Sequence, residues 1–315
     1  MKFKKLLVLL LTLALITSSF AACGGEEAEA PAEPPATEEP VESTVVEDAA
    51  MAYFANLPEN RNMIEMADLM AKIDAGEEMF ILDVRSQEDY DKGHLKGAVN
   101  MPFASTAIAD NLEFIPDDVP VFVNCYTGQT ANQVTSVLNV AGKPVTNIKG
   151  GFLRGITVTE GHEAYLDTVS VPVPSDVYAV DEELKAAVAD YFDVLVSYNG
   201  TPTANQNIAV ETVKEIIDSE SDEYFILSVR QAEDFAKGHL PGAVNIPYGN
   251  GMQASFADLP MDKKIVVYCY TGQTASQTVG ILRLLGYEAY NMAFGMGSVE
   301  TEKGWLGAGY EVVTE

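Results

Sequence analysis

Two cysteines with the same neighbours carry the strongest chemical signal in this 315-residue chain. Residues 125–131 and residues 269–275 both have the sequence Cys-Tyr-Thr-Gly-Gln-Thr-Ala. A thiolate is the nucleophilic form of cysteine, and polar, glycine-containing loops favour it more than a packed apolar core does. We therefore expect Cys125 and Cys269 to be catalytic rather than buried core residues.

Each cysteine is expected at the end of a strand and at the start of a helix. The runs VPVFVN before Cys125 and KKIVVY before Cys269 are typical of buried strands of a parallel sheet. Apolar residues at helical spacing follow each loop. Ligands of open α/β sheets bind at the carboxyl ends of the strands, and free N–H groups at a helix start favour an anion. This position would stabilise a thiolate.

The two loops resemble the active-site loop of rhodanese-type sulfurtransferases. The upstream stretches DVRSQEDYDKGHLKGAVNMP (83–102) and SVRQAEDFAKGHLPGAVNIP (228–247) resemble further patterns of that family. The resemblance covers most of residues 63–155 and 208–300. It implies two rhodanese-like α/β domains, each a parallel β-sheet flanked by helices on both faces, and strands alternating with helices favour the same fold.

The resemblance also implies a reaction. Each thiolate would take the outer sulfur of a thiosulfate, polysulfide or mercaptopyruvate-type donor as a persulfide and pass it to a thiol or cyanide-type acceptor. No cofactor and no metal are implied, and no histidines have the spacing of metal ligands. Glycines would let each loop curl its N–H groups towards the sulfur, threonines would add hydroxyl donors, and the glutamines would point outward to the substrate. The expected substrate-binding residues are Tyr126, Thr127, Gly128, Gln129 and Thr130 in the first loop, and Tyr270, Thr271, Gly272, Gln273 and Thr274 in the second.

The loops depart from the family in charge. Many rhodaneses have cationic residues directly after the cysteine or at the last loop position, where this chain has tyrosine and threonine. A dianion such as thiosulfate would lose charge-assisted hydrogen bonds there, in a chain of net charge −28. The same charge argues against nucleic acid as a partner. Neither loop contains the arginine that a phosphatase loop would need.

Two other residue types recur in both copies. His94 and His239 lie in Gly-His-Leu, where we expect the imidazole to bond the backbone and fix a turn. Arg85 and Arg230 could bind substrate, but we favour ion pairs with glutamates three residues further on, Glu88 and Glu233. Asp83 corresponds to Ser228, which predicts different reactivity in the two copies.

The chain begins like an exported lipoprotein. Residues 1–22 have the basic start and apolar core of a secretory signal peptide, and Ala-Ala-Cys-Gly-Gly around Cys23 resembles a bacterial lipobox. Cys23 is the expected lipidation site, and cleavage elsewhere, leaving a free thiol, is the alternative. We expect a protein held at the cell membrane by its lipid anchor only, exposed on the extracytoplasmic side.

Repetition sets the domain boundaries. The matching motifs keep nearly the same spacing in both copies, which indicates two similar domains. Three cysteines, each with its own explanation, predict no structural disulfide. The expected divisions are the signal peptide (1–22), the lipidated cysteine with a disordered acidic tether (23–48), domain 1 (49–170), a linker (171–185) and domain 2 (186–315).

Two alternatives to sulfur transfer remain open. The cation-poor loops and the serine at 228 would suit a non-catalytic rhodanese-fold module that binds or senses at the cell surface. A thiol redox partner of exported proteins is weaker, because the Cys-x-x-Cys pair usual in such proteins is absent.

Overall fold

The computed structural model describes residues 44–314, which belong to one compact unit. The predicted signal peptide, Cys23 and residues 24–43 of the acidic tether lie outside the described residues. Residues 45–48, predicted to end the disordered tether, instead form the start of a helix. Within residues 44–314, no helix has the length and apolar character needed to cross a membrane.

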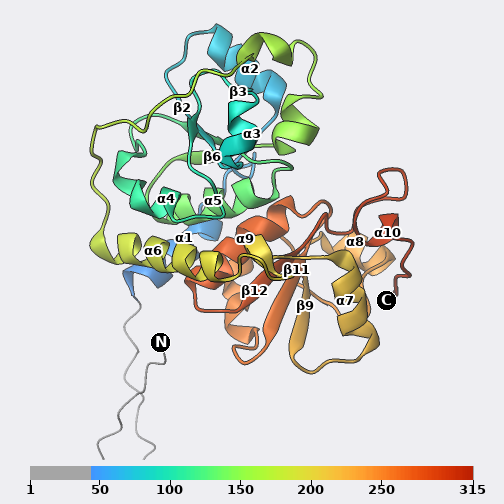
Figure 1. Ribbon diagram of the computed structural model, residues 1–315. Coiled ribbons are helices and arrows are strands. Elements are labelled where there is room, and N and C mark those ends of the chain that lie inside the picture. The colour runs from blue at the N-terminus through green and yellow to red at the C-terminus, as the bar shows by residue number, and fades with distance from the viewer. Residues whose placement is uncertain (1–43, 315) are drawn as a thin grey trace, which may run out of the picture. The chain divides into compact units, whose positions relative to one another are not determined.

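The first domain is built on a five-stranded parallel sheet in the order β1-β6-β5-β2-β4 (Figure 1). Its strands are β1 (Met63–Ile64), β2 (Phe80–Asp83), β4 (Val99–Asn100), β5 (Val121–Asn124) and β6 (Val145–Ile148). Its helices and turns are α2 (Met66–Asp74), α3 (Gln87–Asp91), α4 (Ala107–Asp110), η1 (Leu112–Phe114), α5 (Gln129–Val140), η2 (Phe152–Ile156) and η3 (His162–Tyr165). A short antiparallel pair, β3 (His94–Leu95) with β7 (Leu166–Asp167), lies apart from the main sheet.

The second domain repeats this order, with β8-β12-β11-β9-β10 in a second parallel sheet. Its strands are β8 (Asn207–Ile208), β9 (Tyr224–Ser228), β10 (Val244–Asn245), β11 (Lys264–Tyr268) and β12 (Ala289–Met292). Its helices and turns are η4 (Ala204–Gln206), α7 (Val210–Asp218), α8 (Ala232–Lys237), η5 (Met252–Asp258), α9 (Gln273–Leu284) and α10 (Gly304–Gly307). The predicted pair of parallel-sheet α/β domains is confirmed.

The helix that precedes each domain in the sequence packs on the core of the other domain. Helix α1 (Val45–Ala55) buries Phe54 edge-on to Phe256 of the second domain, with the ring centroids 5.6 Å apart. Helix α6 (Glu182–Ser197) buries Phe192 against Phe103 of the first domain, at 6.0 Å. The two domains therefore share their cores through exchanged helices.

Helices α5 and α9, which follow the two cysteine loops, pack directly on each other (Figure 1). A Cβ on Gly280 of α9 would lie 2.2 Å from Ser136 Oγ and 3.2 Å from Gln133 O of α5, so a larger residue would require Ser136 to turn away and the helices to separate slightly. Tyr53 donates a hydrogen bond to Gln277 Oε1 at 2.7 Å, and Tyr191 donates one to Gln133 Oε1 at 2.9 Å. This contact brings the two cysteine loops near each other.

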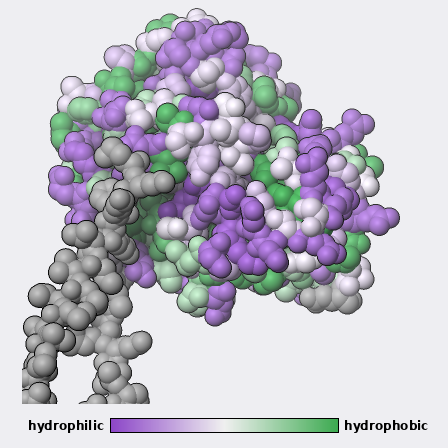
Figure 2. Space-filling view, turned by 60° about the horizontal axis from the view of Figure 1, so that its bottom comes forward, coloured by the Kyte–Doolittle hydropathy of each residue, from purple (hydrophilic) through white to green (hydrophobic). Residues whose placement is uncertain are grey.

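The C-terminal segment, which contains the single tryptophan, closes the second domain. Trp305 is buried in a core with residues of β8, β11 and β12. Its indole N–H donates to Glu311 O at 2.8 Å. On the face shown in Figure 2, hydrophilic residues cover much of the surface and hydrophobic ones form smaller separate areas, in keeping with the acidic composition.

Candidate active site

Cys125 follows the last residue of β5, whose four residues are all buried in the sheet. The chain then turns through Gly128, which has φ 81° and precedes the first residue of α5. The N–H of Gly128 donates to Cys125 Sγ at 3.2 Å. The predicted geometry of strand end, curled glycine loop and helix start is therefore present.

The second loop has the same geometry. Cys269 follows β11, and Gly272 has φ 83° at the start of α9. The N–H of Gly272 donates to Cys269 Sγ at 3.1 Å. A left-handed backbone here favours glycine, because a Cβ would be strained at this φ.

A second backbone segment covers each loop. In the first domain, Phe152 N donates to Cys125 O at 2.7 Å, and a Cβ on Gly151 would lie only 2.5 Å from that oxygen. In the second domain, Met296 N donates to Cys269 O at 2.8 Å, and a Cβ on Gly295 would lie 2.4 Å away. We call residues 150–153 and 294–297 the cover segments. Sequence reasoning missed them, although a glycine at the matching position of both repeats was a usable signal.

Both cysteines are buried, although the sequence predicted that they would not be core residues. Cys125 is 2% exposed and Cys269 is 1% exposed, and each packs partly against its domain core. A surface pocket of about 500 Å³ lies over Tyr126 and Phe152 in the first domain. A donor in that pocket reaches Cys125 Sγ only when the loop or its cover segment moves.

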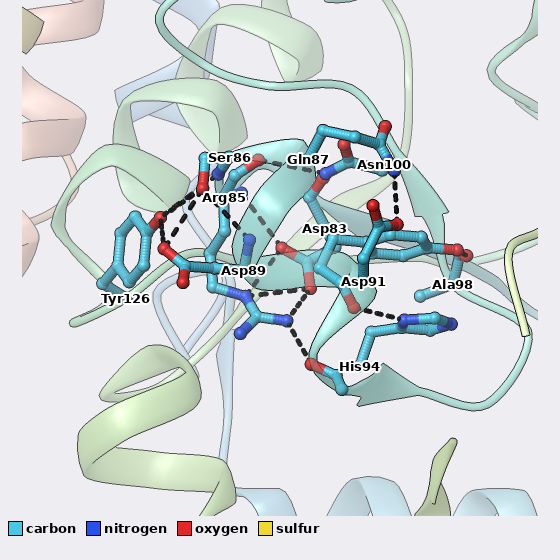
Figure 3. Close-up of polar contacts among 12 residues, drawn as sticks. Asp83, Arg85, Ser86, Gln87, Asp89, Asp91, His94, Ala98, Asn100 and Tyr126 are labelled. Carbon is cyan, nitrogen blue, oxygen red and sulfur yellow. Dashed lines mark hydrogen bonds and ion pairs between the residues drawn. The ribbon is translucent and has the colours of Figure 1, made fainter. Parts of the chain in front are cut away.

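The tyrosine after each cysteine is fixed by a carboxylate. The Tyr126 hydroxyl donates to Asp89 Oδ2 at 2.6 Å and accepts from Ser86 N at 3.2 Å (Figure 3). Hydrogen bonds from Lys92, Tyr126 and Ser86, in that order of strength, lower the pKa of Asp89 to about 2. The mouth of the first site therefore holds a carboxylate that stays ionised.

Tyr270 repeats this arrangement in the second domain. Its hydroxyl donates to Asp234 Oδ2 at 2.6 Å and accepts from Gln231 N at 3.2 Å. The pKa of Asp234 is lowered, chiefly by Tyr270 and then by Lys237. Tyr126 and Tyr270 are 36% and 37% exposed, so both rings face the solvent side of their loops.

The predicted partner of Arg85 was wrong. Arg85 is buried and pairs with Asp83, two residues before it, through Nε at 3.0 Å and Nη2 at 2.6 Å (Figure 3). It also donates to Gly93 O at 2.8 Å and stacks on the Phe152 ring of the cover segment at 3.7 Å. Arg85 forms an ion pair within its own domain, as predicted, but its partner is Asp83 and not Glu88.

Arg230 also lacks its predicted glutamate. It donates to Gly238 O at 2.6 Å and to Asp234 O at 2.9 Å, and its buried Nε has no hydrogen-bond partner among the described residues. Ser228 stands where the first domain has Asp83 and offers no charge. The guanidinium lies 5.3 Å from the centre of the Tyr270 ring, so a cation without a direct ion pair among the described residues adjoins the second loop. Its charge contributes, after Tyr270 and Lys237, to the lowered pKa of Asp234.

The histidines of the Gly-His-Leu motifs bond the backbone, as predicted. His94 Nδ1 lies 2.7 Å from Tyr90 O, and its ring stacks on the Tyr90 ring. His239 Nδ1 lies 2.9 Å from Phe235 O, with the same stacking. Both imidazoles fix the turn after a helix.

The remaining loop residues differ in where they point. Gln129 and Gln273 do not point outward, because their amide oxygens bond the opposite domain. Their amide nitrogens donate to Thr127 Oγ1 at 3.1 Å and Thr271 Oγ1 at 3.3 Å. Thr130 and Thr274 are half-buried in the first turns of α5 and α9.

The sequence profile of a known family, described as the Rhodanese-like domain, matches residues 65–154 and 209–302. Together these two matches cover more than half of the chain. This chain belongs to the rhodanese-like family. Each rhodanese-like match contains one cysteine loop and its upstream Gly-His-Leu motif, so both repeats are members.

Several curated relatives of the rhodanese-like chain are named sulfurtransferases. The tRNA sulfurtransferase of Desulfurococcus amylolyticus is 30% identical over 37% of this chain and 22% of its own length. The thiosulfate:glutathione sulfurtransferase of Saccharomyces cerevisiae is 22% identical over 30% of this chain and 81% of its own length. A third relative, the HTH-type transcriptional regulator Rv0324 of Mycobacterium tuberculosis, is 31% identical over 36% of this chain and 52% of its own length.

These alignments each concern about one rhodanese-like domain. The chain covers between 22% and 52% of the length of the first curated relatives that it matches. Membership of the family and the domain fold follow from the comparisons, whereas the activity of the whole chain is a proposal.

Proposed function

We propose that this protein is a sulfurtransferase in which Cys125 and Cys269 each carry one sulfane sulfur as a persulfide. The observation that carries the proposal is the N–H group of Gly128 or Gly272 directed at each sulfur, at 3.2 and 3.1 Å. Donors held in this way stabilise negative charge on a thiolate and on an added sulfur. The sulfurtransferase names of several relatives support the same reaction class.

The reaction has two displacements. The Cys125 thiolate attacks the transferable sulfur of the donor, and an Sγ–S bond forms. The electron pair of the broken bond, S–S in thiosulfate or polysulfide and C–S in 3-mercaptopyruvate, leaves with the rest of the donor, in the last case as the enolate of pyruvate. An acceptor thiolate then attacks the same outer sulfur, and the Cys125 thiolate leaves. Neither step needs an external oxidant, a reductant or a cofactor.

We further propose that the two sites differ in the charge of donor that they accept. Near Cys125, Arg85 is neutralised by Asp83, and Lys92 is paired with Asp89 and Glu88. Near Cys269, Lys237 is likewise paired with Asp234, but Arg230 donates to backbone carbonyls and has no ion-pair partner among the described residues. Less of its positive charge is therefore neutralised than that of Arg85. Thiosulfate, a dianion, should therefore load Cys269 in preference to Cys125, whereas 3-mercaptopyruvate, chiefly a monoanion at neutral pH, should discriminate less between the two.

Mass spectrometry of peptides tests both proposals. The protein is treated with thiosulfate, polysulfide or 3-mercaptopyruvate, and each cysteine peptide is examined for a gain of about 32 Da, one sulfur atom. Cys125→Ser and Cys269→Ser serve as site controls. Absence of the added mass at both cysteines with every donor would contradict sulfur transfer. Equal loading of the two cysteines by thiosulfate would contradict only the proposed difference in donor charge between the two sites.

A second candidate is a rhodanese-fold module that binds or senses without turnover. The enclosure of both cysteines favours it, at 2% and 1% exposure, and one relative is named a transcriptional regulator. Replacing both cysteines by serine separates the two functions. A sensing module that needs no thiol keeps its cellular phenotype in the double variant, and a sulfurtransferase loses it.

We also propose that Cys23 is lipidated and holds the protein on the extracytoplasmic side of the cell membrane. The sequence of residues 1–25 supports this location. In a bacterial host, Cys23→Ser should release the protein from the membrane fraction. Retention of the variant in that fraction would contradict a lipid anchor.

A further inference from the structure

The first glutamine of each helix after the cysteine loops bonds the opposite domain. Gln129 Oε1 accepts from Phe294 N at 3.0 Å and from Asn291 Nδ2 at 2.9 Å. Gln273 Oε1 accepts from Gly150 N at 3.1 Å and from Asn147 Nδ2 at 3.4 Å. Each domain therefore supplies one glutamine hydrogen-bond acceptor to the other domain, next to the packed helices α5 and α9.

Each bonded amide is the start of a cover segment. Gly150 directly precedes Gly151, which lies against Cys125 O and Gly128 N. Phe294 directly precedes Gly295, which lies against Cys269 O and Gly272 N. Each glutamine thus bonds the chain one residue away from the glycine that packs against the backbone of the other domain's cysteine loop.

The glutamine oxygens also touch the opposite loops. A Cβ on Gly128 would lie 2.6 Å from Gln273 Oε1, and a Cβ on Gly272 would lie 2.5 Å from Gln129 Oε1. Gly128 and Gly272 are the residues whose N–H groups donate to the sulfurs. One side chain therefore contacts both walls of the opposite thiol site, the loop and its cover.

Each glutamine amide is held in this orientation by its own loop. Gln129 Nε2 donates to Thr127 Oγ1 at 3.1 Å, and Gln273 Nε2 donates to Thr271 Oγ1 at 3.3 Å. Because the partners of the oxygens include a backbone N–H, the oxygen must face the opposite domain. A movement of one cysteine loop is thereby transmitted to the cover of the other site.

We propose that Gln129 and Gln273 are cross-domain positioning residues, each of which holds closed the site of the other domain's thiol. Gln273 acts on Cys125, and Gln129 acts on Cys269. The inference deepens the proposed function and rests on it only in treating both cysteines as reactive thiols. Access to each thiol then depends on the conformation of the other domain's cysteine loop.

The test measures the alkylation rate of each cysteine by iodoacetamide, followed by peptide mass spectrometry across a range of pH. Gln273→Met keeps the side-chain length and removes the acceptor oxygen. Loss of the hydrogen bonds from Gly150 N and Asn147 Nδ2 should open the cover more often and raise the Cys125 rate about twofold to tenfold, with a smaller change at Cys269. Gln129→Met should raise the Cys269 rate and change Cys125 less.

Two variants act as controls. Gln273→Glu keeps an oxygen that can accept from Gly150 N, so the Cys125 rate should return to within about twofold of the original protein. Gln87→Met removes an exposed glutamine that bonds Asp91 within α3, and should change neither rate. If Gln273→Met does not fold, Gln273→Asn, one methylene shorter, is judged by the same criterion.

Several results would overturn the inference. These are an effect confined to the thiol of the mutated loop, equal acceleration of both thiols, or no change at either. Alkylation needs no sulfur donor, so the outcome is separate from that of the persulfide experiment. A protein that forms no persulfide could still show the cross-domain effect, and an active sulfurtransferase could lack it.

Discussion

Gly151 is the residue on which closure of the first site depends most directly. Its φ of 61° is left-handed, and a Cβ would lie 2.5 Å from Cys125 O and 2.6 Å from Gly128 N. Contacts this short against backbone cannot be relieved by turning a side chain. Any larger residue must push the cover segment away from the cysteine loop.

Gly151→Ala should therefore damage the first site specifically. Left-handed strain alone typically costs about 1–3 kcal/mol of stability. We expect Gly151→Ala to lose more than this, because the clash adds to the strain, and to form less persulfide on Cys125 than on Cys269. Gly142→Ala is the matched control, because Gly142 has φ 82° but open space around it. Denaturant unfolding and peptide mass spectrometry measure the two effects. Equal stability losses in the two variants would contradict the steric argument.

The Tyr126–Asp89 contact gives a prediction about pH. The pKa of Asp89 is lowered to about 2, with Lys92 as the largest cause and Tyr126 as the second. The ionised carboxylate therefore stabilises the folded protein above the carboxyl's ordinary pKa of about 4, and this contribution disappears as the pH falls towards 2. Tyr126→Phe should raise the pKa of Asp89, and Lys92→Met should raise it more. Carboxyl NMR titration would contradict this order if Tyr126→Phe had the larger effect.

At the scale of single elements, the end of β2 differs from the end of β9 by one carboxylate. Asp83 and Arg85 form a buried ion pair, so removing one partner leaves an uncompensated charge. Asp83→Ser should cost about 3–5 kcal/mol, the usual penalty for breaking a buried pair from one side. Chemical denaturation measures it, and Glu88→Ser, which removes an exposed carboxylate, should cost less than about 1 kcal/mol.

The reverse change in the second domain tests the same reasoning. Ser228→Asp places a carboxylate where Arg230 has a buried Nε without a partner. We expect less thiosulfate-derived persulfide on Cys269, because the new carboxylate neutralises the cation. Loading by 3-mercaptopyruvate, which carries less charge than thiosulfate, should change less. An equal fall with both donors would instead indicate general damage to the site.

The sequence could predict these elements because their signals are local. The apolar run before Cys125 indicated a buried strand, and Gly128 indicated a curled loop, since both depend on near neighbours. The partner of Arg85 was missed because helical spacing favours Glu88 on the surface, whereas burial selects the carboxylate that shares the interior. The direction of Gln129 could not be predicted, because its partners Asn291 and Phe294 belong to the other repeat.

At the scale of the molecule, the exchanged helices make the two domains depend on each other. Helix α1 contributes Ala50, Tyr53 and Phe54 to the core of the second domain. Helix α6 contributes Val188 and Phe192 to the core of the first. The sequence could not tell which sheet each helix would cover, because an amphipathic helix face does not specify the apolar surface on which it packs.

Helix exchange predicts that a cavity in one helix will loosen the domain that follows the other. Phe54→Ala removes a fully buried ring and should cost about 3–5 kcal/mol. Amide hydrogen exchange should then rise more in β9 and β11 than in β2 and β5, although α1 precedes the first domain. Phe192→Ala in α6 should give the opposite distribution, and Val194→Ala, at a position 46% exposed, should change little. Faster exchange confined to the domain that directly follows each mutated helix would show that the exchanged packing does not stabilise the protein in solution, because a core contact protects the strands on which it packs.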